Sequence, residues 1–223
     1  MQAKKRRDVR DLRGRLRGET AYVLGNGPSV REHDLSVLRG KHVIGMNASP
    51  LLDREFGFQS EYYVVSDARF LNHPEKRAYA TSMLPHDVTR VLREELRALD
   101  AGDWLDATYY VNVLGKNGFS SDLRRGFYFG CTTAMLAIQL AAHAEASRIV
   151  LLGCDFRYPK DQPRFYKEDN PQDQDPFLSI QIWNIRNAFN ELRRRGCEMV
   201  ICTKSTNLTP YVPYAPLEEI ARN

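Results

Sequence analysis

The sequence predicts an α/β fold: a single-domain, Rossmann-like, mostly parallel sheet with helices on both faces and a mobile lid loop. Three observations favour this class. Short apolar runs recur along the chain and are near-continuous, as expected for parallel strands that are covered on both faces. Helical stretches lie between these runs. The chain has 223 residues, 43% of them hydrophobic, which is enough to bury one full core.

The apolar runs define the expected strands. Each is short, and most show no alternation of apolar and polar residues. These runs are residues 21–24, 42–46, 62–66, 109–114, 149–153 and 199–202.

Two helices carry the clearest signals. In residues 177–195 the apolar side chains fall on one face, and Gly196 supplies a stop signal. Residues 132–143 are rich in Ala, Leu and Ile and carry no Asp, Glu, Lys or Arg, which predicts a buried helix. Between these helices, residues 157–176 are rich in Pro, Gln and Asp, and we expect them to form the lid.

The N-terminus differs in charge from the rest of the chain. Residues 1–18 contain eight Lys or Arg residues and two Asp, which gives this segment a net charge of +6. Since the whole chain carries +4, the remaining residues carry about −2. We expect a basic, helical segment over residues 1–18 and an α/β domain over residues 19–223. A near-neutral body argues against a broad nucleic-acid-binding face.

Two interpretations of the basic segment stay open. Residues 4–17 could contact an anionic membrane surface such as the cytoplasmic leaflet. Alternatively, Val9, Leu12 and Leu16, which lie at helical spacing, pack on the protein's own domain and leave the charges in water.

The remaining composition favours a cytoplasmic protein, peripheral on the inner membrane face if the basic segment binds lipid. No apolar run is long enough to span a bilayer, and the charged N-terminus lacks the apolar core of a secretory signal. The four cysteines, at positions 131, 154, 197 and 202, lack paired metal-type spacing, so we expect reduced thiols and no metal site.

The turn after the first expected strand is the most informative segment. It reads Gly25-Asn26-Gly27-Pro28-Ser29 and precedes a stretch that can become helical. Glycine leaves room for close backbone approach, and the amides at a helix start favour anions, so a phosphate is the expected guest. Ser29 is a candidate N-cap. The alternative is a plain strand–helix turn without a ligand.

Polar clusters also follow the other expected strands. Because the carboxyl ends of parallel strands share one edge of a sheet, these clusters predict a single site. They are Met46-Asn47-Ala48-Ser49, Ser66-Asp67, Gly130-Cys131-Thr132-Thr133 at the start of the buried helix, Gly153-Cys154-Asp155-Phe156 and Ser205-Thr206-Asn207.

Taken in order, the first turn, Asn47, the small-residue helix start and Gly153-Cys154-Asp155-Phe156 resemble bacterial sialyltransferases of glycosyltransferase family 42 and the wider clan of 6-hydroxymethylpterin pyrophosphokinase-like proteins. The resemblance covers roughly residues 20 to 207. It implies that Asn26 and Asn47 bind the donor nucleotide and that Asp155 and Phe156 lie near its cytidine. It also implies that two tyrosines after this motif, approximately Tyr158 and Tyr166, hold the leaving phosphate.

The chain departs from that family at the catalytic base. The family uses a histidine downstream of these tyrosines, whereas the histidines here are at 33, 42, 73, 86 and 143. A carboxylate would have to replace it, and the candidates are Asp67, Glu168, Asp169, Asp173 and Asp175. Asp67 is the first choice because a strand end would hold it rigidly, and an N-cap role is its alternative. The resemblance also implies an arginine before the small-residue helix that binds the sugar carboxylate, and Arg124 and Arg125 are the arginines upstream of that helix.

These observations lead to one function and two alternatives. The expected activity is a metal-independent glycosyltransferase that moves a CMP-linked sugar of the sialic acid or Kdo (3-deoxy-manno-octulosonic acid) type to a surface glycan. Arg157, Arg164 and Lys167 of the lid would help the tyrosines to neutralise the phosphate. One alternative is a pyrophosphokinase that uses ATP with Mg²⁺ held by the Asp-rich lid. The other is a nucleotide-binding protein without catalysis.

Overall fold

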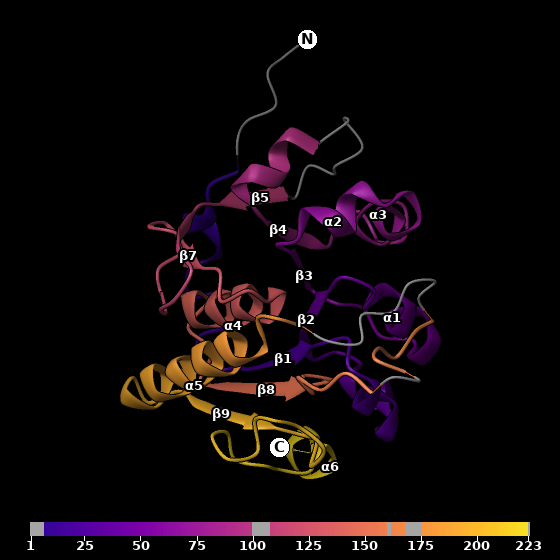
Figure 1. Ribbon diagram of the computed structural model, residues 1–223, viewed down its shortest axis with the longest axis vertical. Helices are drawn as coiled ribbons and strands as arrows, with labels where there is room; N and C mark the ends of the chain where they lie inside the picture. Colours follow the sequence, from indigo (N-terminus) through magenta and orange to yellow (C-terminus); the bar gives the residue numbers. More distant parts are fainter. Residues whose placement is uncertain (1–6, 100–107, 160–161, 168–174, 223) are drawn as a thin grey trace.

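A seven-stranded sheet forms the centre of the protein (Figure 1). The computed structural model describes residues 7–99, 108–159, 162–167 and 175–222. Every neighbouring pair of strands in this sheet is parallel, in the order β5-β4-β3-β2-β1-β8-β9. Its strands are β1 (Thr20–Leu24), β2 (His42–Met46), β3 (Tyr62–Val65), β4 (Thr89–Arg93), β5 (Thr108–Val111), β8 (Arg148–Leu152) and β9 (Glu198–Ile201). The predicted α/β class with a mostly parallel sheet is confirmed.

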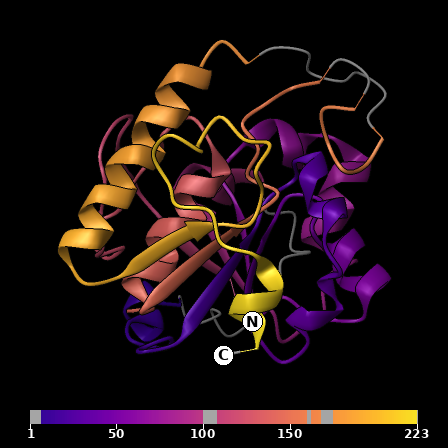
Figure 2. The same ribbon diagram turned by 90° about the horizontal axis from the view of Figure 1, so that it is seen from below.

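Helices cover both faces of the sheet. The helices α4 (Thr133–His143) and α5 (Leu178–Arg194) pack on one face, and α5 runs beside the edge strand β9 (Figures 1 and 2). The opposite face carries α1 (Pro50–Phe56), α2 (Ala68–Asn72), α3 (Pro74–Ala80) and α6 (Leu217–Ala221). Four 3-10 helices complete the layers: η1 (Val9–Leu12), η2 (Pro28–Glu32), η3 (Leu35–Leu38) and η4 (Glu94–Leu99).

Most strand and helix predictions hold. Five of the six expected strands appear within one residue of their expected bounds, and both α4 and α5 form where the helical signals lay. Thr132 caps α4 by accepting a hydrogen bond from the amide of Ala134 at 3.3 Å. Gly196, with a φ of +75°, follows the last turn of α5 in the left-handed conformation that ends helices.

The strand expected over residues 109–114 was wrong in one respect, because the structure splits it. Residues up to Val111 form β5 in the main sheet, whereas β6 (Val113–Gly115) pairs with β7 (Phe127–Tyr128) in a separate two-stranded sheet. The carbonyl of Asn112 between them accepts a hydrogen bond from the amide of Phe127 at 2.9 Å, so the chain leaves the main sheet there.

The sequence reasoning also missed β4. This strand contains Arg90, which breaks the apolar run, yet the Arg90 side chain is fully buried. Its guanidinium donates to the carbonyls of Ala80 at 3.0 Å and Val88 at 3.2 Å, which compensates part of the cost of burying a charge. Burial lowers the pKa of Arg90 from its usual value.

The N-terminal segment packs on the domain. Leu12 and Leu16 are fully buried and Val9 is 9% exposed, all within the core cluster that includes α4. The amide of Leu16 donates to the carbonyl of Ala144 at 2.8 Å. Arg17 pairs with Glu145 at 2.6 Å, beyond the end of α4. The helix expected over residues 1–18 is reduced to the 3-10 turn η1, because bonds to the residues at the end of α4 hold the chain after η1 in an irregular path. Lys4, Lys5 and Arg6 lie outside the described residues.

Within the described part of the chain, no helix has the length and apolar character needed to cross a bilayer. The strand order has a switch point at β1, which pairs with β2 on one side and β8 on the other. In an open parallel sheet, the crevice beyond the carboxyl ends of such a strand pair is where ligands bind.

Candidate active site

The turns that follow β1 and β8 lie back to back at this switch point. The amide of Gly27 donates to the carbonyl of Gly153 at 2.8 Å, and the amide of Gly25 donates to Leu152 at 2.7 Å. A Cβ on Gly25 would collide with the carbonyl oxygen of Gly153, and one on Gly27 would lie 2.5 Å from the carboxyl carbon of Asp155. The sequence reasoning assigned these glycines to close approach of a ligand, but what approaches them is the second turn.

The start of η2 already holds an anion from the protein itself. Asp155 accepts hydrogen bonds from the amide of Ser29 at 2.9 Å and from the Ser29 hydroxyl. Asp155 is 5% exposed, and burial raises its pKa although both Ser29 bonds oppose the rise. The N-cap of η2 is Gly27 and Pro28 is its first residue, so Ser29 is not the N-cap. The Asp155 carboxylate thus takes the position at this helix start where the sequence predicted a phosphate.

Asn26 fixes the relation between the ends of β1 and β2. Its side-chain nitrogen donates to the carbonyl of Met46 at 3.1 Å, and its oxygen accepts from the amide of Ala48 at 3.1 Å. The following residue of the β2 turn, Asn47, has a φ of +50°, and its carbonyl accepts from the hydroxyl of Tyr63 at 2.6 Å. The side-chain oxygen of Asn47 is buried and accepts no hydrogen bond in the described structure. Asn47, which lines a small hollow at this edge of the sheet, therefore has an unpaired acceptor, whereas both ends of the Asn26 amide are engaged.

The turn of residues 153–156 is supported from behind by the residues after β9. The Thr206 hydroxyl donates to the carbonyl of Asp155 at 2.9 Å, and the Asn207 side chain donates to the carbonyl of Phe156 at 2.6 Å. These bonds hold Phe156 at a φ of +48°, an uncommon conformation for a residue other than glycine. The expected cluster at 205–207 thus positions the turn.

The start of α4 lies at this edge of the sheet and faces the space beyond the ends of β3 and β1. Thr132 and Thr133 line the space in front of it, and the Thr133 hydroxyl lies 2.9 Å from that of Ser66 at the end of β3. A helix of 11 residues presents partial positive charge at its first turn, where the amides of Ala134 and Met135 bond to Thr132. This end suits a phosphate better than the short η2 does.

Two hollows meet at Thr132 and Thr133. The smaller, of about 100 Å³, is lined by the β1 and β8 turns, by Asn47, and by Arg157, Tyr158 and Arg164 of the expected lid. The Arg164 guanidinium lies over the Tyr158 ring, 4.9 Å from its centroid. Small-molecule sites usually measure about 300–1,000 Å³, so a whole nucleotide requires the lid segment to move outwards.

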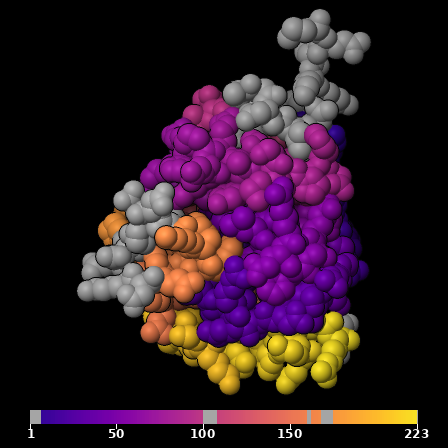
Figure 3. All heavy atoms as spheres, turned by 90° about the vertical axis from the view of Figure 1, so that its right-hand side faces the viewer, coloured from indigo at the N-terminus to yellow at the C-terminus, as the bar shows by residue number. Residues whose placement is uncertain are grey.

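The described part of the lid rests on the first half of the chain. The amide of Phe165 donates to the carbonyl of Asn26 at 3.1 Å, and Arg31 lies over the Phe165 ring at 5.6 Å. Tyr166 packs edge-on against Phe165 and Tyr79, outside the residues that line either hollow. Figure 3 shows residues 162–167 in orange at the surface against the violet first half. The structure thus brings Tyr158 and Arg164 to the hollow and places Tyr166 as an anchor; Glu168, Asp169 and Asp173 lie outside the described residues.

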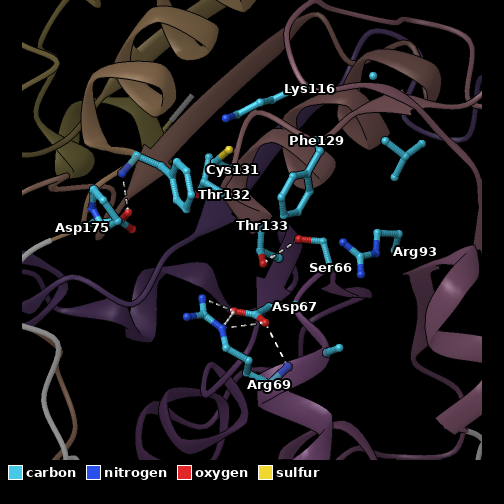
Figure 4. A pocket seen from close by; sticks show the side chains of 15 residues that line it. Ser66, Asp67, Arg69, Arg93, Lys116, Phe129, Cys131, Thr132, Thr133 and Asp175 are labelled. Carbon is cyan, nitrogen blue, oxygen red and sulfur yellow. Dashed lines mark hydrogen bonds and ion pairs between the residues drawn. The ribbon is translucent and has the colours of Figure 1, made fainter.

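The larger hollow is a cavity of about 590 Å³ (Figure 4). Val113, Phe129 and Phe177 give it apolar walls, and Cys131, Lys116 and Arg93 border it. Burial raises the pKa of the Cys131 thiol, which disfavours its reactive thiolate form. The sequence reasoning did not identify Arg93 or Lys116. Recognition of β4 would have placed Arg93 at the strand end, and Lys116 lies between Gly115 and Asn117-Gly118 in a turn-like signal.

Two carboxylates of the described residues, Asp67 and Asp175, line this cavity. Asp67 is the N-cap of α2, accepting from the amide of Arg69 at 2.9 Å, and its carboxylate also pairs with the Arg69 guanidinium at 2.8 Å. Asp175 accepts from the amide of Phe177 at 2.9 Å, from Gln181 at 2.8 Å and from the Tyr158 hydroxyl at 3.3 Å. Both carboxylates are held rigidly, and Asp175 joins the lid to the start of α5.

Other side chains considered for the site lie elsewhere. Arg124 pairs with Asp122 at 2.6 Å, and Arg124 and Arg125 line a separate groove beside the N-terminal segment. In the described residues no group of three or more His, Cys, Asp or Glu side chains gathers as a metal site would require, and all four cysteines are free.

No family model matches the chain. The probable 3-deoxy-manno-octulosonic acid transferase of Salmonella typhimurium is 23% identical, over 95% of this chain and 93% of that protein.

Among solved structures, the sialyltransferase CstII from Campylobacter jejuni, determined with cytidine-5'-monophosphate, superposes with a TM-score of 0.57 at 13% identity over 90% of this chain and 86% of CstII. The MAf glycosyltransferase from Magnetospirillum magneticum gives a TM-score of 0.61 at 11% identity over 93% of this chain, which spans only 37% of that protein. At these identities the two structures establish that the chain has the fold of these glycosyltransferases.

Proposed function

We propose that this protein is a glycosyltransferase that transfers an acidic sugar of the sialic acid or Kdo type from a CMP-linked donor to a glycan acceptor, without a metal ion. The observation that carries the proposal is the meeting of two hollows at the start of α4. One hollow is small and polar and the other is large with apolar walls, so a donor phosphate at Thr132 and Thr133 would have its sugar directed into the larger cavity. The near-full-length likeness to a probable Kdo transferase supports the same reaction class.

The chemistry needs charge stabilisation on the leaving group. A sugar leaves with the CMP phosphate, on which negative charge grows as the glycosidic bond breaks. The positive end of α4, the Arg164 guanidinium and the Tyr158 hydroxyl are the groups we assign to that charge. Burial raises the pKa of Tyr158, so its hydroxyl stays protonated and can donate at neutral pH. Asp67, at the floor of the larger cavity, is the base that we assign to the acceptor hydroxyl.

The nucleotide contacts follow from the small hollow. Asn47 would bind the donor directly through its unused side-chain oxygen, whereas Asn26 and Asp155 would act by holding the turns. Phe156, held in the left-handed conformation, would face the cytosine ring of the donor. Because the hollow is smaller than a nucleotide, we propose that Arg157, Tyr158 and Arg164, which line it, move outwards for entry and close over the bound donor.

A thermal-shift screen with CMP, CDP, ATP and GTP, each with Mg²⁺ and with EDTA, tests this proposal. CMP is expected to raise the Tm equally with and without Mg²⁺, since a ligand that binds only the folded state stabilises it by mass action. Stabilisation by ATP only in the presence of Mg²⁺ would support the pyrophosphokinase alternative. CMP binding without sugar transfer to any acceptor would support the non-catalytic one.

A matched pair of variants assigns the site. Asn47→Gly removes the side-chain amide, and glycine tolerates the φ of +50°, so the fold should keep its stability. We expect CMP affinity to fall about tenfold, as for the loss of one hydrogen bond to a buried group. Asn187→Ala on α5, outside both hollows, is the control and should bind CMP normally. Unchanged CMP affinity in Asn47→Gly would place the nucleotide elsewhere.

A further inference from the structure

Two aromatic rings line the larger cavity, and a cationic side chain lies over each of them. Lys116 lies over the ring of Phe177, with its amino nitrogen 4.8 Å from the centroid, and Arg93 lies over the ring of Phe129 at 5.3 Å. Phe177 is 45% exposed, so its ring is available to a ligand. Aromatic rings bind the apolar faces of sugar rings well, and a cation beside each ring adds recognition of negative charge.

Among the described residues that line the cavity, the cations exceed the carboxylates by one. Asp67 and Arg69 neutralise one another through their ion pair, and Asp175, whose carboxylate accepts from uncharged donors, offsets one of the charges of Arg93 and Lys116. The Nε atom of Arg93 lies 3.1 Å from the carboxylate of Glu95, and Glu95 does not line the cavity. No carboxylate of the described residues lies within ion-pairing distance of Lys116, whose side chain is exposed.

Arg93 and Lys116 enter the cavity from different elements, as Figure 4 shows. Arg93 ends β4 and is 22% exposed, and Lys116 follows β6. A cavity of about 590 Å³ has room for a sugar beside the start of α4 as well as for a further group on the Lys116 side.

We propose that this cavity is the acceptor site and that it selects an acidic sugar, one that carries a carboxylate or phosphate group bound by Lys116 and Arg93. The assignment rests on the proposed function, which places the donor phosphate at Thr132 and Thr133. The anionic group of the acceptor pairs with Lys116, beside Phe177, while Arg93 on the other side of Phe129 adds positive charge to the cavity. The acceptor hydroxyl faces the α4 end, where Asp67 lines the same cavity.

The test is a titration of simple sugars followed by saturation-transfer NMR, with and without saturating CMP. Glucuronate and glucose 6-phosphate are the carboxylate and phosphate probes, and glucose is the neutral one. The acidic sugars are expected to bind about tenfold more tightly than glucose, the effect of a charge-assisted hydrogen bond near the surface. In Lys116→Gln this advantage is lost and glucose binding is unchanged, whereas Lys116→Arg keeps it.

The control is Lys204→Gln. Lys204 lies over the ring of Tyr214 at 5.0 Å and outside the cavity, so it reproduces the cation–ring geometry elsewhere. Arg93→Gln is a second variant on the cavity wall. Equal binding of acidic and neutral sugars, or acidic binding that survives Lys116→Gln, overturns the proposal.

Two further outcomes separate this proposal from the donor assignment. Free N-acetylneuraminate, the sugar of a sialic acid donor, is titrated in parallel. If it alone shows Lys116-dependent binding, the cations bind the donor sugar and the acceptor proposal is wrong. If CMP fails to stabilise the protein while the acidic hexoses still bind through Lys116, the donor assignment fails and the acidic-sugar site stands.

Discussion

At the residue scale, the site depends on which polar groups are already engaged. Asn26 and Asp155 were assigned to the nucleotide by resemblance, yet each is bonded to a distant part of the chain. Asp155 and Ser29 are 126 positions apart, and Asn26 reaches Met46 and Ala48. Such pairings depend on the strand order, so their residue types were predictable from the sequence but their partners were not. The side-chain oxygen of Asn47, by contrast, has no hydrogen-bond partner in the described structure, and Asn47 lines the smaller hollow.

The role of Asp67 can be tested by a substitution that keeps its structural function. Asparagine caps helices about as well as aspartate, so Asp67→Asn should alter the free energy of unfolding little. Without a basic carboxylate we expect turnover to fall about 10²- to 10⁴-fold, with CMP affinity nearly unchanged. Measurement of kcat beside a CMP titration checks both.

Asp175→Asn is the companion to that variant, because Asp175 faces the same cavity. Full turnover in Asp67→Asn together with loss in Asp175→Asn would place the base at the start of α5. Loss of CMP binding in Asp67→Asn would indicate that Asp67 contacts the nucleotide.

At the element scale, the two arginines of β4 hid that strand, although its other residues are typical of one. Propensity and hydrophobicity could not reveal that Arg90 would be buried under the carbonyl of Ala80 at the end of α3. The α4 and α5 helices were predictable because their signals are local: small apolar residues in one and a one-sided apolar face in the other. The two-stranded sheet of β6 and β7 was not, since β7 has only two residues.

The link between α1 and β3 predicts a pH dependence of stability. Asp53 of α1 accepts from the amide of Ser60 at 2.9 Å and its hydroxyl at 3.1 Å, and it is 8% exposed. Burial raises the pKa of Asp53 from 3.8 to about 6 despite these bonds. Between these values the folded state binds more protons than the unfolded state, so this group's contribution to the free energy of unfolding decreases as the pH rises.

Asp53→Asn removes that titration while keeping an oxygen for the Ser60 amide. From pH 4 to pH 7, the free energy of unfolding of wild type should fall by about 2–3 kcal/mol relative to that of Asp53→Asn. Urea unfolding of both proteins across this range measures it. A pH-independent difference would mean that Asp53 is ionised throughout.

At the scale of the whole molecule, the basic N-terminal segment is part of the fold. Deletion of residues 1–18 would remove Val9, Leu12 and Leu16 from the core, which should destabilise the protein by several kcal/mol. Deletion therefore cannot separate membrane binding from folding. The side chains of Arg10 and Arg15 are exposed, and their replacement by Gln should leave the core intact.

We propose that these arginines contribute to contact with an anionic membrane, and the double variant Arg10→Gln, Arg15→Gln tests this. Co-sedimentation with phosphatidylserine vesicles at low and high salt should show weaker, less salt-dependent binding than wild type, by about 1 kcal/mol per arginine. The double variant Arg193→Gln, Arg195→Gln at the end of α5 is the control for a general charge effect. Equal vesicle binding by wild type and the N-terminal variant would reject the membrane contact.

The contact between Gly25 and Gly153 determines which parts of the site can be redesigned. A side chain at either position would collide with the backbone of the other turn. Substitution of either glycine would therefore push the β1 and β8 turns apart and move the residues that line the smaller hollow. Val113, Phe129 and Phe177 border open space in the larger cavity, so they can change size without moving the main chain. Altered sugar preference should therefore be sought on those walls, with the two glycines left fixed.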